Sequence, residues 1–445
     1  MPSTVYTMEM RSHSTQTGLV AQALRLFEAA GYDDLVNPGD IVAVKLHCGE
    51  WNNTAYLRPV YARAICDRIK ELGGKPFVCD TTTLTYSPTA DRVTAPDLMR
   101  VAERNGFTSA TLGAPFIAAD GFNGTDDVHV DLPEGYILQE AYIAKALALA
   151  DSAIVLTHFK GHPLGMVGGS IKNMGIGAQS KRGKYNVHMG GHPTYSLPAT
   201  VIEHPEHVND AVLNAIPDVC PYGALEKNNG TYQWHRDKCT SCLGCLGLMV
   251  SNGVWETPVR YYAAQQAAMA DGALAAVKAL KGKVGFLNFA IDISPRCDCV
   301  DHADTALVPH IGIFAGRDPV ALDQACLDAV VASQGTPGSA ADDWGVMGTG
   351  DHKFAHASGV SPDVIGMSEE IQIKTAVKNG LGSAEYELVE VEPHDTNYAY
   401  LDPMDRRKVG LKYGPLYQRE NPFPEERHDG LGFDRKTEID IEAVM

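Results

Sequence analysis

The fold class is set by residues 40–83, DIVAVKLHCGEWNNTAYLRPVYARAICDRIKELGGKPFVCDTTT. The apolar run at residues 41–44 predicts a short buried strand. Pro59 then opens a helix that stops at Gly73, and a second strand follows over residues 76–79. A strand, a helix and a second strand in this order predict a βαβ unit with parallel strands.

The same alternation of helix and strand patterns extends on both sides of this unit. Further helices are expected over residues 19–30, 96–105, 141–150, 261–280, 318–331 and 368–379. Further strands are expected over residues 153–156, 284–293, 311–314 and 386–391. We therefore predict an α/β fold with a mostly parallel sheet layered with helices.

One segment interrupts this alternation and suggests an insertion. Residues 203–256 hold four of the ten cysteines and are expected to form a small inserted domain. The α/β domain then consists of a first part, residues 1–202, and a second part, residues 257–395. Residues 396–445, rich in Pro, Asp, Glu and Arg, form a C-terminal extension that we expect to wrap the surface or an oligomer partner.

Composition and charge exclude several classes of protein. The 445 residues are 44% hydrophobic and 21% charged, which is an ordinary globular composition and excludes disorder, collagen and coiled coil. The net charge of -18 argues against nucleic acid or an anionic membrane as a partner. No apolar run approaches the roughly 20 residues of a membrane span, and the first residues lack a signal-peptide pattern. A cytoplasmic protein is therefore expected.

The strongest chemical signal is a cluster of cysteines within the predicted insertion. Cys239, Cys242 and Cys245 form a C-x2-C-x2-C run, and Cys220 precedes it in a Cys-Pro pair. This pattern resembles one half of a bacterial two-cluster ferredoxin and predicts one [4Fe-4S] cluster with these four ligands. The alternative is a four-cysteine zinc site, although two separated C-x2-C pairs are the usual spacing for zinc. The cluster is expected to relay electrons, while a purely structural role is the alternative.

A second signal is a basic segment without acidic residues. Residues 152–202 contain no Asp or Glu, although the whole chain has 55. The segment holds many glycines and the cations and histidines His158, Lys160, His162, Lys172, Lys181, Arg182, Lys184, His188 and His192. Glycines allow close backbone approach and the cations supply counter-charge, so an anionic ligand with phosphate or carboxylate groups is expected. The alternatives are a solvated basic loop and, less in keeping with the spacing, a zinc site built from the histidines.

Polar and reactive side chains follow several of the predicted strands. They are Lys45, His47, Asp80, Thr81, Lys160, His162, Cys297 and Cys299. The carboxyl ends of parallel strands meet at one edge of a sheet, where open α/β folds bind their ligands, so these side chains are expected to share one crevice. Cys297 and Cys299 could hold a second metal, relay electrons or act as acid–base groups. The alternative is that the loop residues only cap turns and that the thiols are structural.

Several blocks of this sequence together resemble the domain of unknown function 362 family. They are KLHCGEWNNTAYLRP, FVCDTTTLTY, THFKGHPLGMVGGSIKNMGIG, RGKYNVH, the Cys220–Cys245 insert, CDCVDHADTALVPHIGIFAGRDPVALDQA and GLGSAEYELVEV. The resemblance implies an α/β domain with a ferredoxin-type insertion, since members of the family are described as iron–sulfur proteins. It implies no settled reaction.

These observations lead to the hypothesis of an iron–sulfur oxidoreductase that passes electrons to an anionic small molecule. The expected catalytic residues are His162, His188, Lys172, Cys297 and Cys299. The expected binding residues for substrate or a second, unidentified cofactor are Lys160, Asn173, Lys184, His47, Asp80 and Thr81. A ferredoxin or a flavoprotein is the expected redox partner, and a homo-oligomer is compatible with the sequence. The alternatives are a lyase or isomerase with a structural cluster, and an electron-transfer or binding protein without chemistry of its own.

Overall fold

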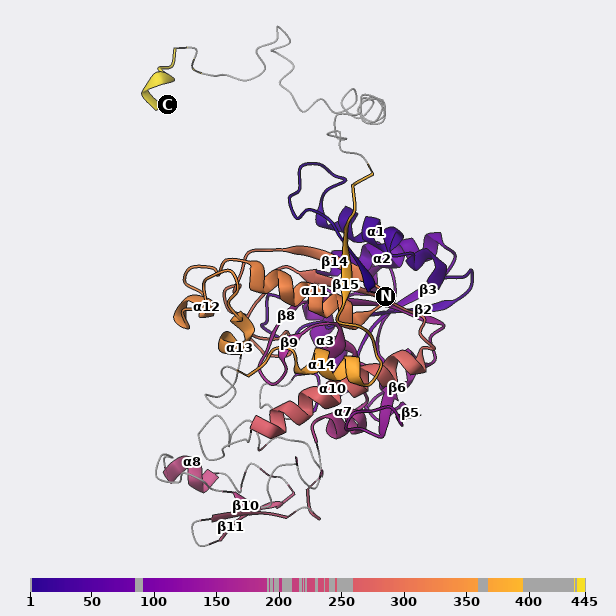
Figure 1. Cartoon of the computed structure of the whole chain (residues 1–445), viewed down its shortest axis with the longest axis vertical. Helices are drawn as coiled ribbons and strands as arrows, with labels where there is room; N and C mark the ends of the chain where they lie inside the picture. The colour runs from indigo at the N-terminus through magenta and orange to yellow at the C-terminus, as the bar shows by residue number, and fades with distance from the viewer. Residues whose placement is uncertain are drawn as a thin grey trace. The chain divides into compact units, whose positions relative to one another are not determined.

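The computed structural model describes most of the α/β part of the chain (Figure 1). It describes residues 2–84, 91–189, 192, 195, 200–201, 210–215, 218, 220, 222–228, 231–235, 237–239, 245, 259–358, 367–394, 436 and 438–444. The chain divides into two compact units. The first consists of residues 1–11 and 19–393, and the second of residues 12–18 and 394–445. All that follows concerns the first unit.

An eight-stranded sheet forms the centre of the first unit. Its strands, in spatial order, are β15 (Tyr386–Glu390), β1 (Ser3–Thr7), β14 (Gly312–Gly316), β13 (Val284–Ala290), β7 (Ser152–His158), β2 (Ile41–Lys45), β3 (Lys75–Asp80) and β4 (Phe116–Ala118). The five strands from β13 to β4 are parallel to one another. Strand β14 runs antiparallel to both of its neighbours, and β1 pairs in parallel with β15. The prediction of an α/β fold with a mostly parallel sheet is confirmed.

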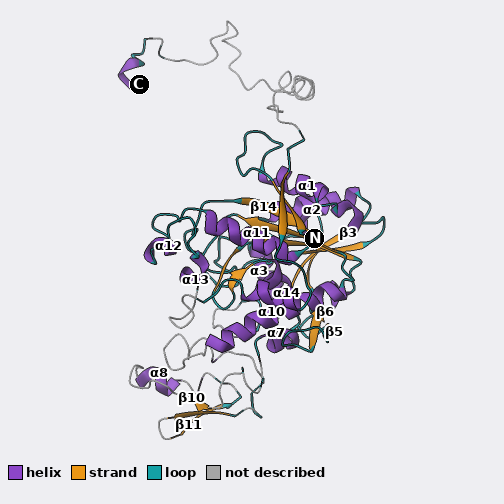
Figure 2. Ribbon diagram, viewed as in Figure 1, coloured by secondary structure: helices purple, strands orange, loops and turns teal. Residues whose placement is uncertain are grey.

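Helices cover the sheet and connect its strands (Figure 2). They are α1 (Leu19–Ala29), α2 (Pro59–Glu71), α3 (Ala95–Arg104), α4 (Ser109–Leu112), α5 (Lys145–Ala148), α6 (Ser170–Gly175), α7 (Lys181–Val187), α8 (Asp210–Ala215), α10 (Val259–Ala279), α11 (Pro319–Ala332), α12 (Ala340–Asp343), α13 (Lys353–Ala357) and α14 (Ile371–Lys378). Among the helices of the described residues, none combines the length and apolar composition that a membrane span needs.

The sheet separates two hydrophobic cores because successive strand residues point to opposite faces. Val42 and Val44 of β2 belong to the core that includes α1 and α2. Ala43, between them, belongs to the other core, which includes α10 and α11. Strands β7 and β13 alternate in the same way, so the central strands are buried on both faces. This burial explains their nearly continuous apolar sequences.

Smaller hairpins accompany the main sheet. Strands β5 (Asp127–Asp131) and β6 (Glu140–Ala144) pair antiparallel, as do β8 (Lys160–His162) and β9 (Met166–Gly168). A three-stranded sheet is formed by β10 (Thr200–Val201), β12 (Thr231–Trp234) and β11 (Leu225–Asn228). Residues 229 and 230, between β11 and β12, lie outside the described residues.

One predicted element is wrong in its first half. A helix was expected over residues 141–150, but residues 140–144 form strand β6 and only the short helix α5 follows. The alanines of this segment favour a helix by intrinsic propensity. Backbone pairing with β5 and the burial of Ala141, Ile143 and Ala144 prevail over that local preference.

Candidate functional site

The carboxyl ends of the parallel strands converge on an internal cavity. Its volume is about 90 Å³, room for about three water molecules at the volume that each takes up in the liquid. The cavity is lined by Lys45, His47, Asp80, Thr81, Thr82, Thr83, Arg92, His162, Pro163, Leu164, Lys172, Asn173, Ile176, Gly177, Lys184, His188, Met269, Cys299 and Val300. Of the residues expected to share one crevice, Lys45, His47, Asp80, Thr81, His162 and Cys299 line this cavity, whereas Lys160 and Cys297 are not among the lining residues.

The lining is strongly cationic for a buried space. Lys45, Arg92, Lys172 and Lys184 all line it and all are buried, whereas Asp80 is the one carboxylate among the lining residues. Buried charges of one sign are costly, so four cations around one small cavity favour a bound anion.

Lys45 and Asn173 form a hydrogen-bonded floor for the cavity. The Lys45 ammonium donates to Asn173 Oδ1 at 2.6 Å and lies 3.5 Å from Asp80 Oδ1. The amide of Asn173 in turn donates to Leu156 O and to Thr157 Oγ1 of strand β7. These bonds fix the amide's orientation. They join helix α6 to the ends of β2, β3 and β7.

Asp80 is held as a carboxylate at the end of β3. Burial favours its protonated form, but Lys45, His47 and Arg92 outweigh burial and hold the pKa of this carboxyl below its ordinary value. The backbone N–H groups of Cys48 and Thr81 donate to its two oxygens. Asp80 therefore anchors the loops that carry the cations of the cavity.

Lys184 reaches the cavity from helix α7. Its ammonium donates to Thr81 Oγ1 at 2.7 Å and to Gln179 O at 2.6 Å. Burial lowers the pKa of Lys184 to about 8, although Asp120 and Asp80 partly oppose that effect. This lysine consequently titrates close to neutral pH.

Arg92 belongs to the site but was absent from the sequence-based prediction. It precedes helix α3, its Nε donates to Glu50 Oε2 at 3.0 Å, and its guanidinium lies 3.9 Å from Asp80. Arg92 follows no predicted strand and lies in no basic cluster of the sequence. The long-range ion pair with Glu50 gives no local signal by which it could have been found.

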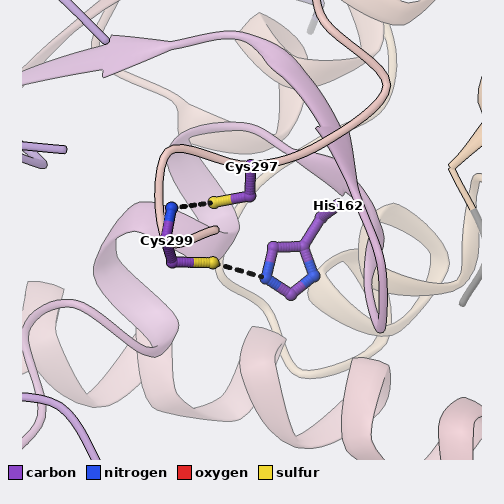
Figure 3. Close-up of side chains that lie close together, drawn as sticks. All are labelled: His162, Cys297 and Cys299. Carbon is purple, nitrogen blue, oxygen red and sulfur yellow. Dashed lines mark hydrogen bonds between the residues drawn. The ribbon is translucent and has the colours of Figure 1, made fainter. Parts of the chain in front are cut away.

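The side chains of Cys297, Cys299 and His162 lie close together (Figure 3). Sγ atoms of Cys297 and Cys299 and a ring nitrogen of His162 lie within 4.8 Å of one another. Lys172 Nζ donates to Cys297 Sγ at 3.1 Å, and Cys299 N approaches the same sulfur at 3.5 Å. Cys299 Sγ lies 3.7 Å from His162 Nε2. This group is compact enough to be a candidate metal-binding site.

The two sulfurs have opposite acidities. Burial favours the neutral thiol of Cys297, but the hydrogen bond from Cys299 and the Lys172 ammonium lower its pKa well below the ordinary value. The same hydrogen bond, together with burial, raises the pKa of Cys299 well above its ordinary value. Negative charge on this pair is therefore favoured at Cys297, beside Lys172.

The hydrogen bonds of His162 define its tautomer. The backbone N–H groups of Leu164 and Gly165 both point at His162 Nδ1, at 3.1 and 2.9 Å. Because Nδ1 accepts these bonds, the proton of the neutral ring is on Nε2, the nitrogen that faces the thiols. Burial and then Lys172 lower the pKa of His162, which keeps the ring neutral. In this tautomer Nε2 is a proton donor to sulfur, whereas a metal at Nε2 would require the opposite tautomer.

Behind the thiols lies a layer of buried ions that holds their loop. Asp298 accepts from His158 Nδ1 at 2.7 Å and pairs with Lys160 Nζ at 3.1 Å. His158 Nε2 faces the carbonyl oxygens of Ile291 and Asp292. Lys160, predicted to bind the ligand, also donates to His158 O at 2.7 Å and is not among the lining residues. Its contacts place it in the support of the site.

The remaining predicted histidines line the cavity as neutral rings. Burial lowers the pKa of His47 to about 3, with Arg92 acting in the same direction, and it lowers the pKa of His188 to about 3. His188 Nδ1 is hydrogen-bonded to the side-chain amide of Gln265 in α10. Lys181 and Arg182, from the same basic segment, do not line the cavity, and Arg182 forms an exposed ion pair with Asp127.

The cysteines of the predicted cluster lie in the insertion. Cys220, Cys239 and Cys245 are partly exposed, and Cys242 lies outside the described residues. The N–H of Ala224 donates to Cys220 Sγ at 3.3 Å. Backbone hydrogen bonds to sulfur are a usual feature of thiolates that ligate iron–sulfur clusters.

Comparisons with known proteins give a family and two distant structural relatives. Residues 42–328 match the family described as "Domain of unknown function (DUF362)". No curated protein matches the chain. The lactate racemase apoprotein from Thermoanaerobacterium thermosaccharolyticum is 14% identical over 75% of this chain, with a TM-score of 0.35, and a Thermotoga maritima protein is 12% identical over 71%, also at 0.35. The matches span 59% and 57% of those two chains.

Proposed function

The chain belongs to the DUF362 family, and for it we propose an enzyme that binds a small anion in the buried cavity and reduces or oxidises it there. The observation that carries this proposal is the cavity itself, whose lining residues include four buried cations and a single carboxylate. A structural core gains nothing from collecting four cations around one cavity, because the burial of each one costs desolvation free energy. An anionic ligand repays that cost.

The size of the cavity limits the substrate class. A volume of about 90 Å³ suits a small carboxylate or phosphate. Lys45, Arg92 and Lys184 supply the positive charge for the anionic group of the substrate. Thr81 and Asn173 offer polar atoms that orient it.

His162 and Cys299 provide the cavity with a proton donor and a thiol. His162 presents an N–H at Nε2, and the thiol of Cys299 lines the cavity next to it. Lys172 holds the Cys297 thiolate and lines the cavity as well. A substrate whose anionic group is bound by the other cations would place its reacting atoms against these donors.

The donor set of the insertion fits a [4Fe-4S] cluster held by Cys220, Cys239, Cys242 and Cys245. The N–H···S bond to Cys220 supports this assignment. The cluster would supply one-electron transfer. We propose residues 203–256 as its domain and a ferredoxin or a flavoprotein as the external electron donor.

The test combines metal analysis with a turnover assay on protein purified without oxygen. We expect about four irons and four sulfides per chain, and oxidation of reduced methyl viologen when a small carboxylate substrate is added. A panel of small 2-oxo acids, unsaturated acids and disulfides covers the substrate class.

Two variants make this assay decisive. Lys172→Met should abolish turnover, because it removes the ammonium beside Cys297. Arg182→Gln removes an exposed cation of the same basic segment and should leave turnover unchanged. Unchanged turnover in Lys172→Met would refute the proposal. Solvent deuterium entering a substrate without viologen oxidation would instead favour a lyase or isomerase.

A further inference from the structure

A dithiol is built into the cavity wall at Cys297 and Cys299. The N–H of Val300 donates to Cys297 O at 3.0 Å and closes a turn around Asp298. In this turn the two cysteines are one residue apart and their sulfurs lie within 4.8 Å of each other. Closing a bond between them requires a change of side-chain rotamer and a small adjustment of the turn.

The intervening residue keeps both thiols on the cavity side. Asp298 is fully buried and points to His158 and Lys160, away from the sulfurs. Figure 3 shows the result, in which Cys297 and Cys299 both approach His162 from one loop. The loop is therefore anchored by its middle residue and leaves its two sulfurs to react.

The two sulfurs differ in their access to the cavity, as a reaction of two thiols in succession requires. Cys299 lines the cavity and is the sulfur that a ligand meets. Cys297 is completely buried behind it, with the Lys172 ammonium 3.1 Å away to stabilise negative charge. The first position suits an attacking sulfur and the second suits a resolving sulfur.

We propose that Cys297 and Cys299 are a redox-active dithiol that reduces a small anionic disulfide bound in the cavity. This proposal rests on the anion site of the proposed function. It adds the substrate class and the groups that carry the two electrons.

The reaction balances in two steps. Cys299 Sγ loses its proton and attacks one sulfur of the substrate R–S–S–R, so that the substrate S–S bond breaks and the leaving RS⁻ takes up that proton. This yields RSH and a mixed disulfide at Cys299. Cys297 then attacks Cys299 Sγ and expels the second RS⁻. The dithiol is oxidised by two electrons, and the disulfide is reduced to two thiols.

Dithiodiglycolate, which carries two carboxylates, and the neutral 2-hydroxyethyl disulfide provide a matched pair of probes. Full-length protein purified without oxygen is mixed with either probe, alkylated and mapped by mass spectrometry. We expect a Cys297–Cys299 disulfide that forms about tenfold faster with dithiodiglycolate, because the cationic cavity concentrates the anion. Cys297→Ser should stop at the mixed disulfide on Cys299, and Cys299→Ser should not react at this loop.

The outcomes separate this proposal from the proposed function. If both cysteines remain free thiols after either probe, the dithiol is refuted. Equal rates for the two probes refute the anionic substrate class. Oxalate binding to Cys299→Ser, measured in parallel, reports on the anion site alone. If oxalate binds and the wild type forms no Cys297–Cys299 disulfide with either probe, only the dithiol proposal is overturned. If the wild type does not bind oxalate, the proposed function is overturned.

Discussion

The affinity of the cavity for an anion is expected to fall as the pH rises through about 8. Burial lowers the pKa of Lys184 to about 8, and its ammonium is one of the four cations that line the cavity. A lysine whose pKa is depressed in the folded protein loses its charge as the pH rises above that value. An anion that needs the charge then binds more weakly.

The magnitude follows from the titration of this single group. If only the charged form of Lys184 binds the anion, the apparent dissociation constant grows about twofold at pH 8 and about tenfold between pH 7 and pH 9. This change corresponds to about 1.4 kcal/mol of binding free energy. His47, His162 and His188 all have lowered pKa values and stay neutral over this range, so they do not contribute to the change of anion affinity with pH.

Isothermal titration with oxalate from pH 7 to pH 9 measures this dependence, since oxalate keeps both charges throughout. Lys184→Met should bind about tenfold or more weakly at pH 7 and show no comparable slope. Lys184→Arg keeps its charge at pH 9 and should bind equally well at both pH values. Arg182→Gln is the control on the same helix. A pH-independent affinity in the wild type, or an unchanged slope in Lys184→Met, would refute the reasoning; the latter would assign the titration to Lys45, whose pKa burial also lowers.

Three further substitutions test the architecture around the site. The hydroxyl of Tyr32 is buried and hydrogen-bonds to backbone groups of β13 and β14, so Tyr32→Phe should lower the free energy of unfolding by about 1–3 kcal/mol in a urea titration. A Cβ on Gly175 would lie 2.0 Å from Met269 O, so Gly175→Ala should separate α6 from α10 and lower both the melting temperature and oxalate affinity. Cys242→Ser should reduce iron and sulfide content while leaving oxalate binding to the α/β domain intact.

Much of the fold was predictable because the parallel strands are buried on both faces. Their short apolar runs, such as residues 41–44, alternate with amphipathic helices and so identify both the class and the strand ends. The antiparallel direction of β14 was not predictable, because an apolar run carries no information about direction. Nor was strand β6, where pairing with β5 prevails over the helical propensity of its alanines.

Site residues that directly follow a strand could be predicted from the sequence. Site residues that are positioned by contacts between distant segments could not. His47, Asp80 and His162 follow strands, so their convergence follows from the topology of a parallel sheet. Arg92 enters the cavity through its ion pair with Glu50, a contact between two segments that show no pattern. The tautomer of His162 depends on two backbone N–H groups and could be derived only from coordinates.

The arrangement around Asp298 explains why cations collect on both sides of one short loop. Lys160 pairs with the Asp298 carboxylate and His158 is hydrogen-bonded to it, and that carboxylate has a lowered pKa although burial opposes it. Lys172 donates to Cys297 Sγ. Lys45, Arg92 and Lys184 line the cavity, with Asp80 as the one lining carboxylate and Glu50 paired with Arg92. Because Lys160 and Lys172 contact the loop while Lys45, Arg92 and Lys184 face the ligand, the support of the sulfurs and the binding of an anion can be perturbed independently.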